Sequence, residues 1–162
     1  MLKKSHISLY CCLLAIGCAP QYIETTADSP QDVPARRAIF ATNPAGLDTA
    51  FKDGCSSPGD TITRPNARTL RCNIVPTPQS AAFLLLEFDA KLEPPKMVVE
   101  KVTRQLSDCV LVEFSYFAEI TAKSGKPQRV YIPNRSLDRR LDQILRASGG
   151  SVDVSTTQPE CI

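Results

Sequence analysis

Cysteine is the residue type in this chain that is best suited to chemistry, because a thiol can be acylated, can form a disulfide and, as a thiolate, can hold a metal ion. The chain of 162 residues contains seven cysteines. Three of them lie within the first 18 residues, at Cys11, Cys12 and Cys18. The other four are spread through the rest of the sequence, at Cys55, Cys72, Cys109 and Cys161. The surroundings of the two groups indicate different chemistry for each.

Cys18 ends a segment with the features of an export signal. A pair of lysines gives the segment a positive start, residues 7–16 are apolar except for one serine, and the small residue Gly17 precedes the cysteine. This segment resembles the lipobox signal of bacterial lipoproteins, although the lipobox prefers Leu where this chain has Ala15. The resemblance implies that residues 1–17 are removed and that the Cys18 thiol is diacylated and becomes the new N-terminus.

Two other interpretations of this segment stay open. An ordinary secretory signal cleaved after Ala19 would release a soluble protein, and an uncleaved segment would remain in the membrane. The apolar run of about ten residues is much shorter than the roughly 20 residues that cross a bilayer, which disfavours the uncleaved segment. Both cleaved forms are exported. The lipoprotein resemblance also implies a cellular location. Because Ala19, and not Asp, follows the acylated cysteine, the resemblance implies the outer membrane, with the domain facing the periplasm.

Export changes what is expected of the four later cysteines. An even number of cysteines in an oxidising compartment predicts two disulfides, and the sequence allows three pairings. We favour Cys55 with Cys72, which closes a local loop, and Cys109 with Cys161, which ties the C-terminal tail to a strand. A zinc site or a redox-active pair is not expected, because no two of these cysteines have the C-x-x-C spacing. We therefore predict no metal and no cofactor.

Removal of residues 1–17 also changes the charge. The full chain has 19 basic and 17 acidic residues, and the removed segment contains two of the lysines, which leaves 17 of each sign. A chain without a basic excess has little electrostatic attraction for nucleic acid. The removed segment also contains the only histidine, His6, so the mature chain has no imidazole to act as a general base. We therefore expect neither an enzyme nor a nucleic-acid-binding protein.

Arginine is concentrated towards the C-terminal end of the chain. The planar guanidinium suits carboxylates and phosphates, so this region can bind an acidic protein partner or anionic lipid head groups. The alternative is an ordinary solvated helix face, in which Asp138 and Asp142 are interspersed with the basic residues. The arginines of this candidate contact surface are Arg129, Arg135, Arg139, Arg140 and Arg146.

Other groups of polar residues indicate structure rather than catalysis. Glu113 and Glu119 would be about 20 Å apart on an extended strand, which is too far for a paired-carboxylate mechanism, and we expect both to be solvated. The serine-containing segments Gly54–Asp60 and Ser148–Ser151 match neither a nucleophile elbow nor a phosphate-binding loop. We expect a disulfide-pinned turn at the first and a helix end at the second.

These residues must be positioned by the elements that follow the signal. Residues 18–48 are rich in Pro, Thr and Gln and predict a flexible tether, with a short strand at Arg36–Ala41 as an alternative, and residues 49–162 predict one domain. The order of its elements predicts an α+β fold, with a small antiparallel sheet of about three or more strands and helices packed on one face. The expected elements are a helix that begins at Pro78 and ends before Pro94, a strand Lys96–Arg104, a long alternating strand Val110–Thr121, a strand Arg129–Ile132 and a helix from about Ser136 to Ala147.

The sequence thus predicts a lipid-anchored protein of the cell envelope that acts by binding. Its expected role is that of an accessory or scaffold component, with the membrane contacted through the N-terminal lipid and with an envelope protein as partner. The alternative is a periplasmic module that binds a small ligand or a glycan on a sheet face containing Phe117 and Tyr131.

Overall fold

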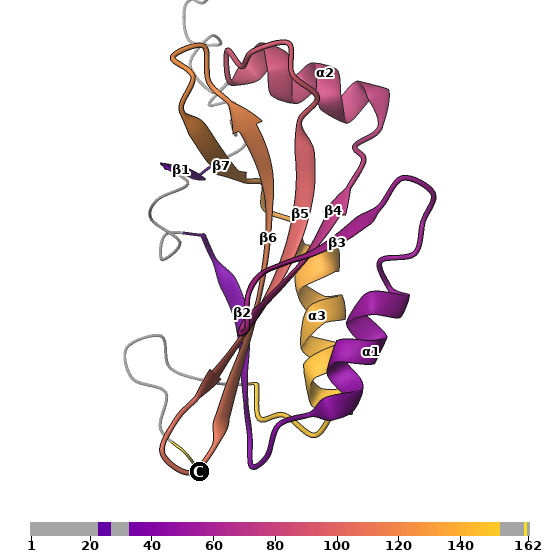
Figure 1. Ribbon diagram of the computed structural model, residues 1–162, viewed down its shortest axis with the longest axis vertical. Helices are drawn as coiled ribbons and strands as arrows, with labels where there is room; N and C mark the ends of the chain where they lie inside the picture. Colours follow the sequence, from indigo (N-terminus) through magenta and orange to yellow (C-terminus); the bar gives the residue numbers. More distant parts are fainter. Residues whose placement is uncertain (1–22, 27–32, 153–160, 162) are drawn as a thin grey trace, which may run out of the picture.

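The computed structural model describes residues 23–26, 33–152 and 161, and in these residues one antiparallel sheet of seven strands carries three helices (Figure 1). The α+β fold with an antiparallel sheet that the sequence predicts is confirmed, and more residues lie in strands than in helices. The elements in chain order are β1 (Ile23–Thr26), β2 (Ala35–Phe40), α1 (Ala45–Asp53), β3 (Thr61–Asn66), β4 (Thr69–Ile74), α2 (Pro78–Glu87), β5 (Lys96–Gln105), β6 (Val110–Thr121), β7 (Pro127–Tyr131) and α3 (Arg135–Ala147).

The long strand β6 organises the sheet. On one edge it pairs with β5 along its length, from Val110 opposite Gln105 to Glu119 opposite Lys96. Its other edge is shared, because β2 pairs with the first half of β6 and β7 pairs with the second half. The strand order is β1-β7-β6-β5-β4-β3, with β2 beside β6. Segments from both ends of the chain therefore meet on a single strand.

The period-two pattern of β6 predicts one buried face and one solvated face, but the strand is buried on both. Its even-numbered residues, such as Val112 and Phe114, face α1 and α3, and we call this side of the sheet the helix face. Its odd-numbered residues, such as Glu113 and Phe117, lie on the opposite side, which we call the charged face. Glu113 and Phe117 are both buried there, because arginine side chains cover this face.

The helices take two positions on the sheet. α1 and α3 lie side by side on the lower part of the helix face, where Leu47 of α1 and Leu145 of α3 pack in one cluster with Phe114 (Figure 1). α2 lies across the opposite end of the sheet, and its Leu84 packs with Ala118 of β6. The sequence predicts α3 to within one residue and predicts the start of α2 correctly, but α2 ends at Glu87, well before the Pro94 that the sequence gives as its limit.

The prediction of a flexible tether over residues 18–48 is wrong for much of its length. Residues 23–26 form β1, which pairs with β7, and residues 35–40 form β2, which pairs with β6. Ala38 of β2 is completely buried, and α1 begins at Ala45. The folded domain therefore begins before residue 49, and residues 18–22 and 27–32 lie outside the described residues.

The short strand that the sequence allows at Arg36–Ala41 as an alternative is confirmed as β2, and its two arginines have partners in the fold. Arg36 lies on the helix face and donates a hydrogen bond from Nε to Asp142 Oδ1 of α3 at 2.8 Å. Arg37 lies on the charged face and donates from Nε to Glu113 Oε1 at 2.6 Å. Each arginine thus has a carboxylate partner more than 70 residues away in the chain, which only the fold brings close.

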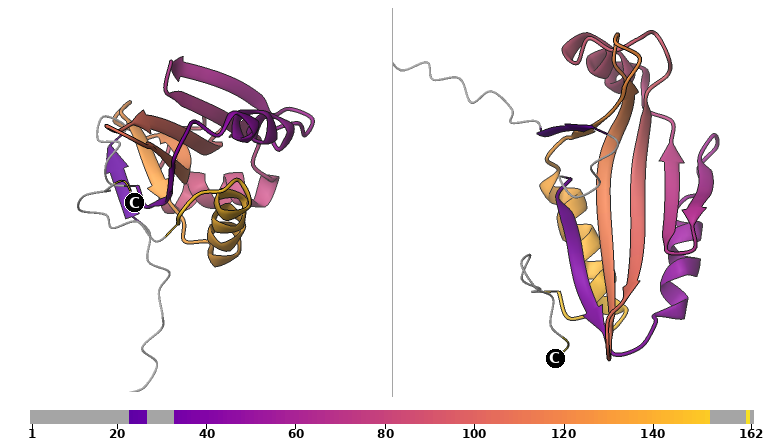
Figure 2. Two further views of the ribbon diagram at one scale, coloured as in Figure 1. Left: turned by 90° about the horizontal axis from the view of Figure 1, so that it is seen from below. Right: turned by 60° about the vertical axis from the view of Figure 1, so that its left-hand side comes forward.

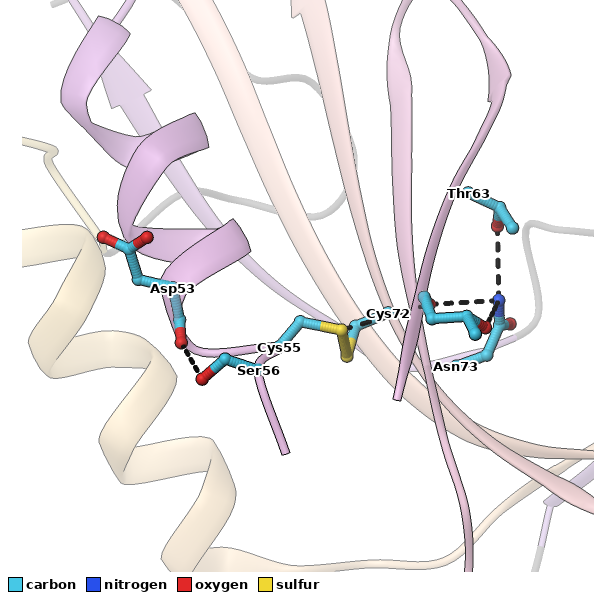
Figure 3. Close-up of a disulfide and its surroundings, with 7 residues drawn as sticks. Asp53, Cys55, Ser56, Thr63, Cys72 and Asn73 are labelled. Atoms are coloured by element: carbon cyan, nitrogen blue, oxygen red, sulfur yellow. Dashed lines mark hydrogen bonds between the residues drawn. A yellow bond between two sulfur atoms is a disulfide. The ribbon is translucent and has the colours of Figure 1, made fainter. Parts of the chain in front are cut away.

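Both favoured disulfides are confirmed. Cys55 and Cys72 join the loop after α1 to β4, with their Cα atoms 5.8 Å apart (Figure 3). Cys109 and Cys161 join the residue before β6 to the C-terminal tail, with their Cα atoms 5.7 Å apart. The sequence did not predict β3 or β4. β3 is an exposed edge strand that contains Pro65, a residue tolerated in a sheet mainly at an edge.

Gly150 provides a test of how the chain after α3 packs on β2. A methyl group at position 150 would lie 2.8 Å from Ala38 Cβ and 2.6 Å from Phe40 Cζ. We expect Gly150→Ala to lower the free energy of unfolding by about 1–3 kcal/mol through overpacking. The control is Gly46→Ala in α1, where a methyl group meets nothing within 4 Å, and it should be neutral or stabilising by up to about 1 kcal/mol. Urea unfolding measures both, and equal stability of the two variants would contradict this packing of β2.

Candidate functional site

α2 is an apolar helix with little cover. Pro78 lies in its first turn, and the Thr77 hydroxyl oxygen caps it by accepting a hydrogen bond from the Ser80 backbone N–H at 3.2 Å. Residues 81–86 are all apolar, yet only Leu84 of the helix is buried, and Leu86 is 84% exposed. Helices that are apolar on all sides are usually buried. α2 therefore leaves apolar surface uncovered at one end of the sheet.

An apolar groove of about 420 Å³ lies along one side of α2, and we call it the α2 groove. Its walls come from the end of β4, from α2 and from the loop between α2 and β5. Val75 and Leu92 stand at this groove with 64% and 94% of their surface exposed. Glu93 and Lys96 are its only charged lining residues. A volume of a few hundred Å³ with mostly apolar walls is typical of a binding site. The other apolar lining residues are Ile74, Pro76, Ala81, Leu85, Pro94 and Pro95.

A second hollow of about 400 Å³ lies on another side of α2, between the helix, the centre of the helix face and the start of α3. Phe83 of α2 and Met97 of β5 line it, together with Tyr116 of β6. Burial raises the pKa of the Tyr116 phenol, because the phenolate would lose hydration. Apolar surface therefore extends from the α2 groove around α2 to Tyr116. This arrangement suits the binding of an apolar partner better than it suits catalysis.

The predicted cysteine sites have different outcomes. Cys18 lies outside the described residues, so its lipidation stays a prediction. The sulfur atoms of Cys55 and Cys72 lie close to the Asp60 carboxylate. Because both sulfur atoms belong to a disulfide, they cannot act as thiolate ligands for a metal ion.

The predicted contact surface is divided by the fold. Arg129 lies in β7 and is buried on the charged face, with its guanidinium 4.7 Å from the centre of the Phe117 ring and with no hydrogen-bond partner for Nε among the described residues. Its inclusion in an exposed contact surface is therefore wrong. The other four arginines, Arg135, Arg139, Arg140 and Arg146, are exposed and lie together on α3. Asp142, at the i, i+4 spacing from Arg146, pairs with Arg36 of β2 instead.

The predicted ligand floor on the sheet is also wrong for Phe117. This ring is completely buried, because Arg129 stacks on it and Val33 packs beside it. Tyr131 stays partly exposed, and burial together with the nearby negative charge of Asp138 raises its pKa. A small molecule on this face would have no access to Phe117.

Glu113 is not solvated as the sequence predicts. Besides Arg37, it pairs with Arg104, whose Nε lies 3.0 Å from Glu113 Oε2. Arg71 pairs with Glu100 in the same way, and its Nη1 lies 3.7 Å from Glu119 Oε2. These carboxylates are engaged by arginines on the sheet, which indicates a structural role.

The sequence contains a signal for the α2 groove that the prediction did not use. After the apolar run of α2, Leu92 lies between Lys91 and Glu93 and close to two prolines. An apolar residue between charges and prolines tends to lie in an exposed loop. A loop of this kind directly after an apolar helix indicates that the helix is near the surface.

No protein-family model, no curated protein and no solved structure matches this chain. Within the part of the chain that the structure describes, no helix is long and apolar enough to cross a membrane. The main surface features of the described residues are the apolar surface around α2 and the exposed arginines on α3.

Tyr116 should remain protonated at pH values where a solvated phenol ionises. Its raised pKa means that the neutral phenol stabilises the fold below pH about 10, the ordinary tyrosine pKa, and that this stability is lost as the pH rises through the higher folded-state value. We expect Tyr116→Phe to remove a late step from the alkaline titration of phenolate absorbance and to reduce the loss of stability above pH about 10. An unchanged titration would contradict the burial of Tyr116.

Proposed function

We propose that this chain is a lipid-anchored protein of the bacterial cell envelope that acts by binding, as an accessory or scaffold component, and that α2 with its groove receives a protein partner. The observation that carries the proposal is the exposure of an apolar helix. Only one residue of α2 is buried although six consecutive residues are apolar. Uncovered apolar surface of this kind usually marks an interaction site.

Two observations support the proposed location in the cell envelope. The segment that ends at Cys18 resembles a lipoprotein signal, and Ala19 favours the outer membrane within that resemblance. The two disulfides suit an oxidising compartment such as the periplasm. Both observations agree with export of the domain, and attachment at its N-terminal end rests on the Cys18 segment alone.

A protein partner explains more of the apolar surface than a small molecule does. A small ligand is typically enclosed by its pocket over most of its own surface. Here Leu86 points away from the groove, and Leu92 projects from it almost fully exposed. An apolar segment of another protein, such as one face of an amphipathic helix, would cover these side chains together with the groove.

A small-ligand module is the second candidate, and the volume of the α2 groove favours it. The ligand would be apolar, because the charged lining is limited to Glu93 and Lys96. It would bind beside α2 instead of on the sheet face of Phe117. A glycan has less support, since its hydroxyl groups need more hydrogen-bonding side chains than this groove provides.

The lipid anchor predicts that cells grown with a radiolabelled fatty acid incorporate the label into the wild-type protein. Cys18→Ala should abolish the incorporation, because the acylated thiol is absent. Cys12→Ala is the matched control and should keep the label, since Cys12 lies in the removed segment. Equal labelling of the wild type and of Cys18→Ala would contradict the anchor.

The α2 groove predicts a defined crosslink in intact cells. A photoreactive amino acid at Leu92 should give an adduct with one envelope protein, and the same group at Arg68, in the exposed turn between β3 and β4, should not. Leu86→Gln with Val75→Gln should weaken the adduct about tenfold or more, because each removes the burial of an apolar side chain.

Three results would contradict the protein partner. The first is an equal adduct at both positions. The second is saturable thermal stabilisation by an apolar small molecule with no protein adduct, which would favour the second candidate. The third is flotation of unacylated Cys18→Ala protein with lipid vesicles, which would assign α2 to the bilayer.

A further inference from the structure

The strand β1 limits how far the folded domain can stand from its lipid anchor, an inference that rests on the proposed acylation of Cys18. Only residues 19–22 separate Cys18 from Ile23, the first residue of β1. A fully extended chain advances about 3.3–3.6 Å per residue, so the anchor lies at most about 18 Å from β1. A flexible tether over residues 18–48 would have allowed several times this distance.

β1 places the anchor on a definite side of the molecule. Ile23 lies opposite Tyr131 in the pairing of β1 with β7, and α3 begins four residues after Tyr131. Arg36 of β2 pairs with Asp142 of α3, which ties these two elements together. The right-hand view of Figure 2 shows β1, β2 and α3 along one side of the molecule, with β3 on the other side. A short anchor would therefore hold the β1, β2 and α3 side next to the bilayer.

Three exposed arginines form a row on α3, which we call the α3 crest: Arg135, Arg139 and Arg146. At 100° per residue they fall within about 40° of one another around the helix, and at 1.5 Å per residue they span about 16 Å. None of the three forms an ion pair with any described residue.

The acidic residues of α3 lie beside the crest but form no ion pair with it among the described residues. Asp138 and Asp142 lie on the flank towards β2, where Asp142 is held by Arg36. Arg140 lies about 100° away from Arg139 around the helix and is outside the row. The crest therefore presents three guanidinium groups that pair with no carboxylate among the described residues, and Arg139 Nε donates to the Arg135 carbonyl oxygen at 3.2 Å.

We propose that the α3 crest rests on anionic phospholipid head groups, so that the lipid anchor and the crest together hold the domain flat against the bilayer. Guanidinium groups match phosphate oxygens in geometry and in charge. Three arginines at an anionic surface would favour the docked over the undocked orientation by roughly a hundredfold. The contact would weaken in high salt, because exposed charges are screened.

The chain contains no tryptophan, so a single introduced tryptophan can report the orientation. Gln143→Trp places the reporter on the exposed side of α3 next to the crest, and Ala67→Trp places a control in the turn between β3 and β4. The full-length protein, purified from the cells that produce it, is bound to vesicles of phosphatidylcholine alone or of phosphatidylcholine with phosphatidylglycerol. Iodide quenching then measures exposure of the reporter to water.

We expect iodide to quench Gln143→Trp severalfold less on the anionic vesicles than on the neutral ones, and high salt should remove the difference. Ala67→Trp should be quenched equally on both. R135Q/R139Q/R146Q should restore full quenching of Gln143→Trp. The control K52Q/R64Q/R68Q removes the same charge from α1, β3 and the turn after β3, outside the crest, and should have no effect. Unchanged urea midpoints show that both triple variants stay folded.

The outcomes distinguish failure of the proposed acylation from failure of the crest contact. Wild-type protein that fails to float with either kind of vesicle would overturn the acylation and, with it, the proposed function. Protein that floats, but whose Gln143→Trp reporter is quenched fully on anionic vesicles, would overturn the crest contact alone. Shielding that is equal on neutral and anionic vesicles, or that survives R135Q/R139Q/R146Q, would also overturn it.

Discussion

The shared edge of β6 is the constraint on which the rest of the structure depends. One strand of 12 residues accepts β2 on its first half and β7 on its second half, while β5 occupies its other edge. β2 comes from the N-terminal part of the chain and β7 leads into α3. Their common partner therefore places residues from both ends of the chain side by side. The Cys109–Cys161 disulfide joins the C-terminal tail to the residue that precedes the same strand.

Charged pairs fix the elements around this strand because each pair joins segments that are distant in sequence. Lys101 of β5 is buried on the helix face, where its Nζ donates to Asp48 of α1 and to Thr103 Oγ1, the latter at 3.0 Å. A buried ammonium group without such partners would be costly, so the position of α1 and the presence of Lys101 depend on each other. Arg36 and Asp142 relate β2 to α3 in the same way, although that pair is more exposed.

The sequence predicts the elements whose pattern is local. The alternation of β6 needs only its own residues, and so does the stripe of Leu141 and Leu145 in α3, with Asn134 capping that helix. The disulfides followed from the inferred compartment and from an even number of cysteines. The strand at β2 was only an alternative to a tether, because its arginines look solvated until the fold supplies Glu113 and Asp142.

The candidate site was less accessible to prediction than the fold. The burial of Arg129 depends on Phe117, which lies across the sheet on the neighbouring strand and gives no signal in the local sequence. α2 was predicted as a helix, but its exposure is decided by where it lies relative to the other helices. An apolar run cannot indicate whether other elements cover it. Exposure of this kind arises from tertiary arrangement alone.

The proposed anchor lies next to β1, and the uncovered apolar surface lies around α2 at one end of the sheet. The proposed position of the lipid anchor depends on the N-terminal segment being part of the sheet. Hydrogen exchange of the purified protein, followed by mass spectrometry of peptides that cover residues 23–26 and 35–40, tests this most directly. The account predicts slow exchange of the amides in both segments, with β2 exchanging about as slowly as its partner β6. Exchange of both segments at the rate of an unstructured chain would contradict the account, because the anchor would then be joined to the domain by a long, free tether.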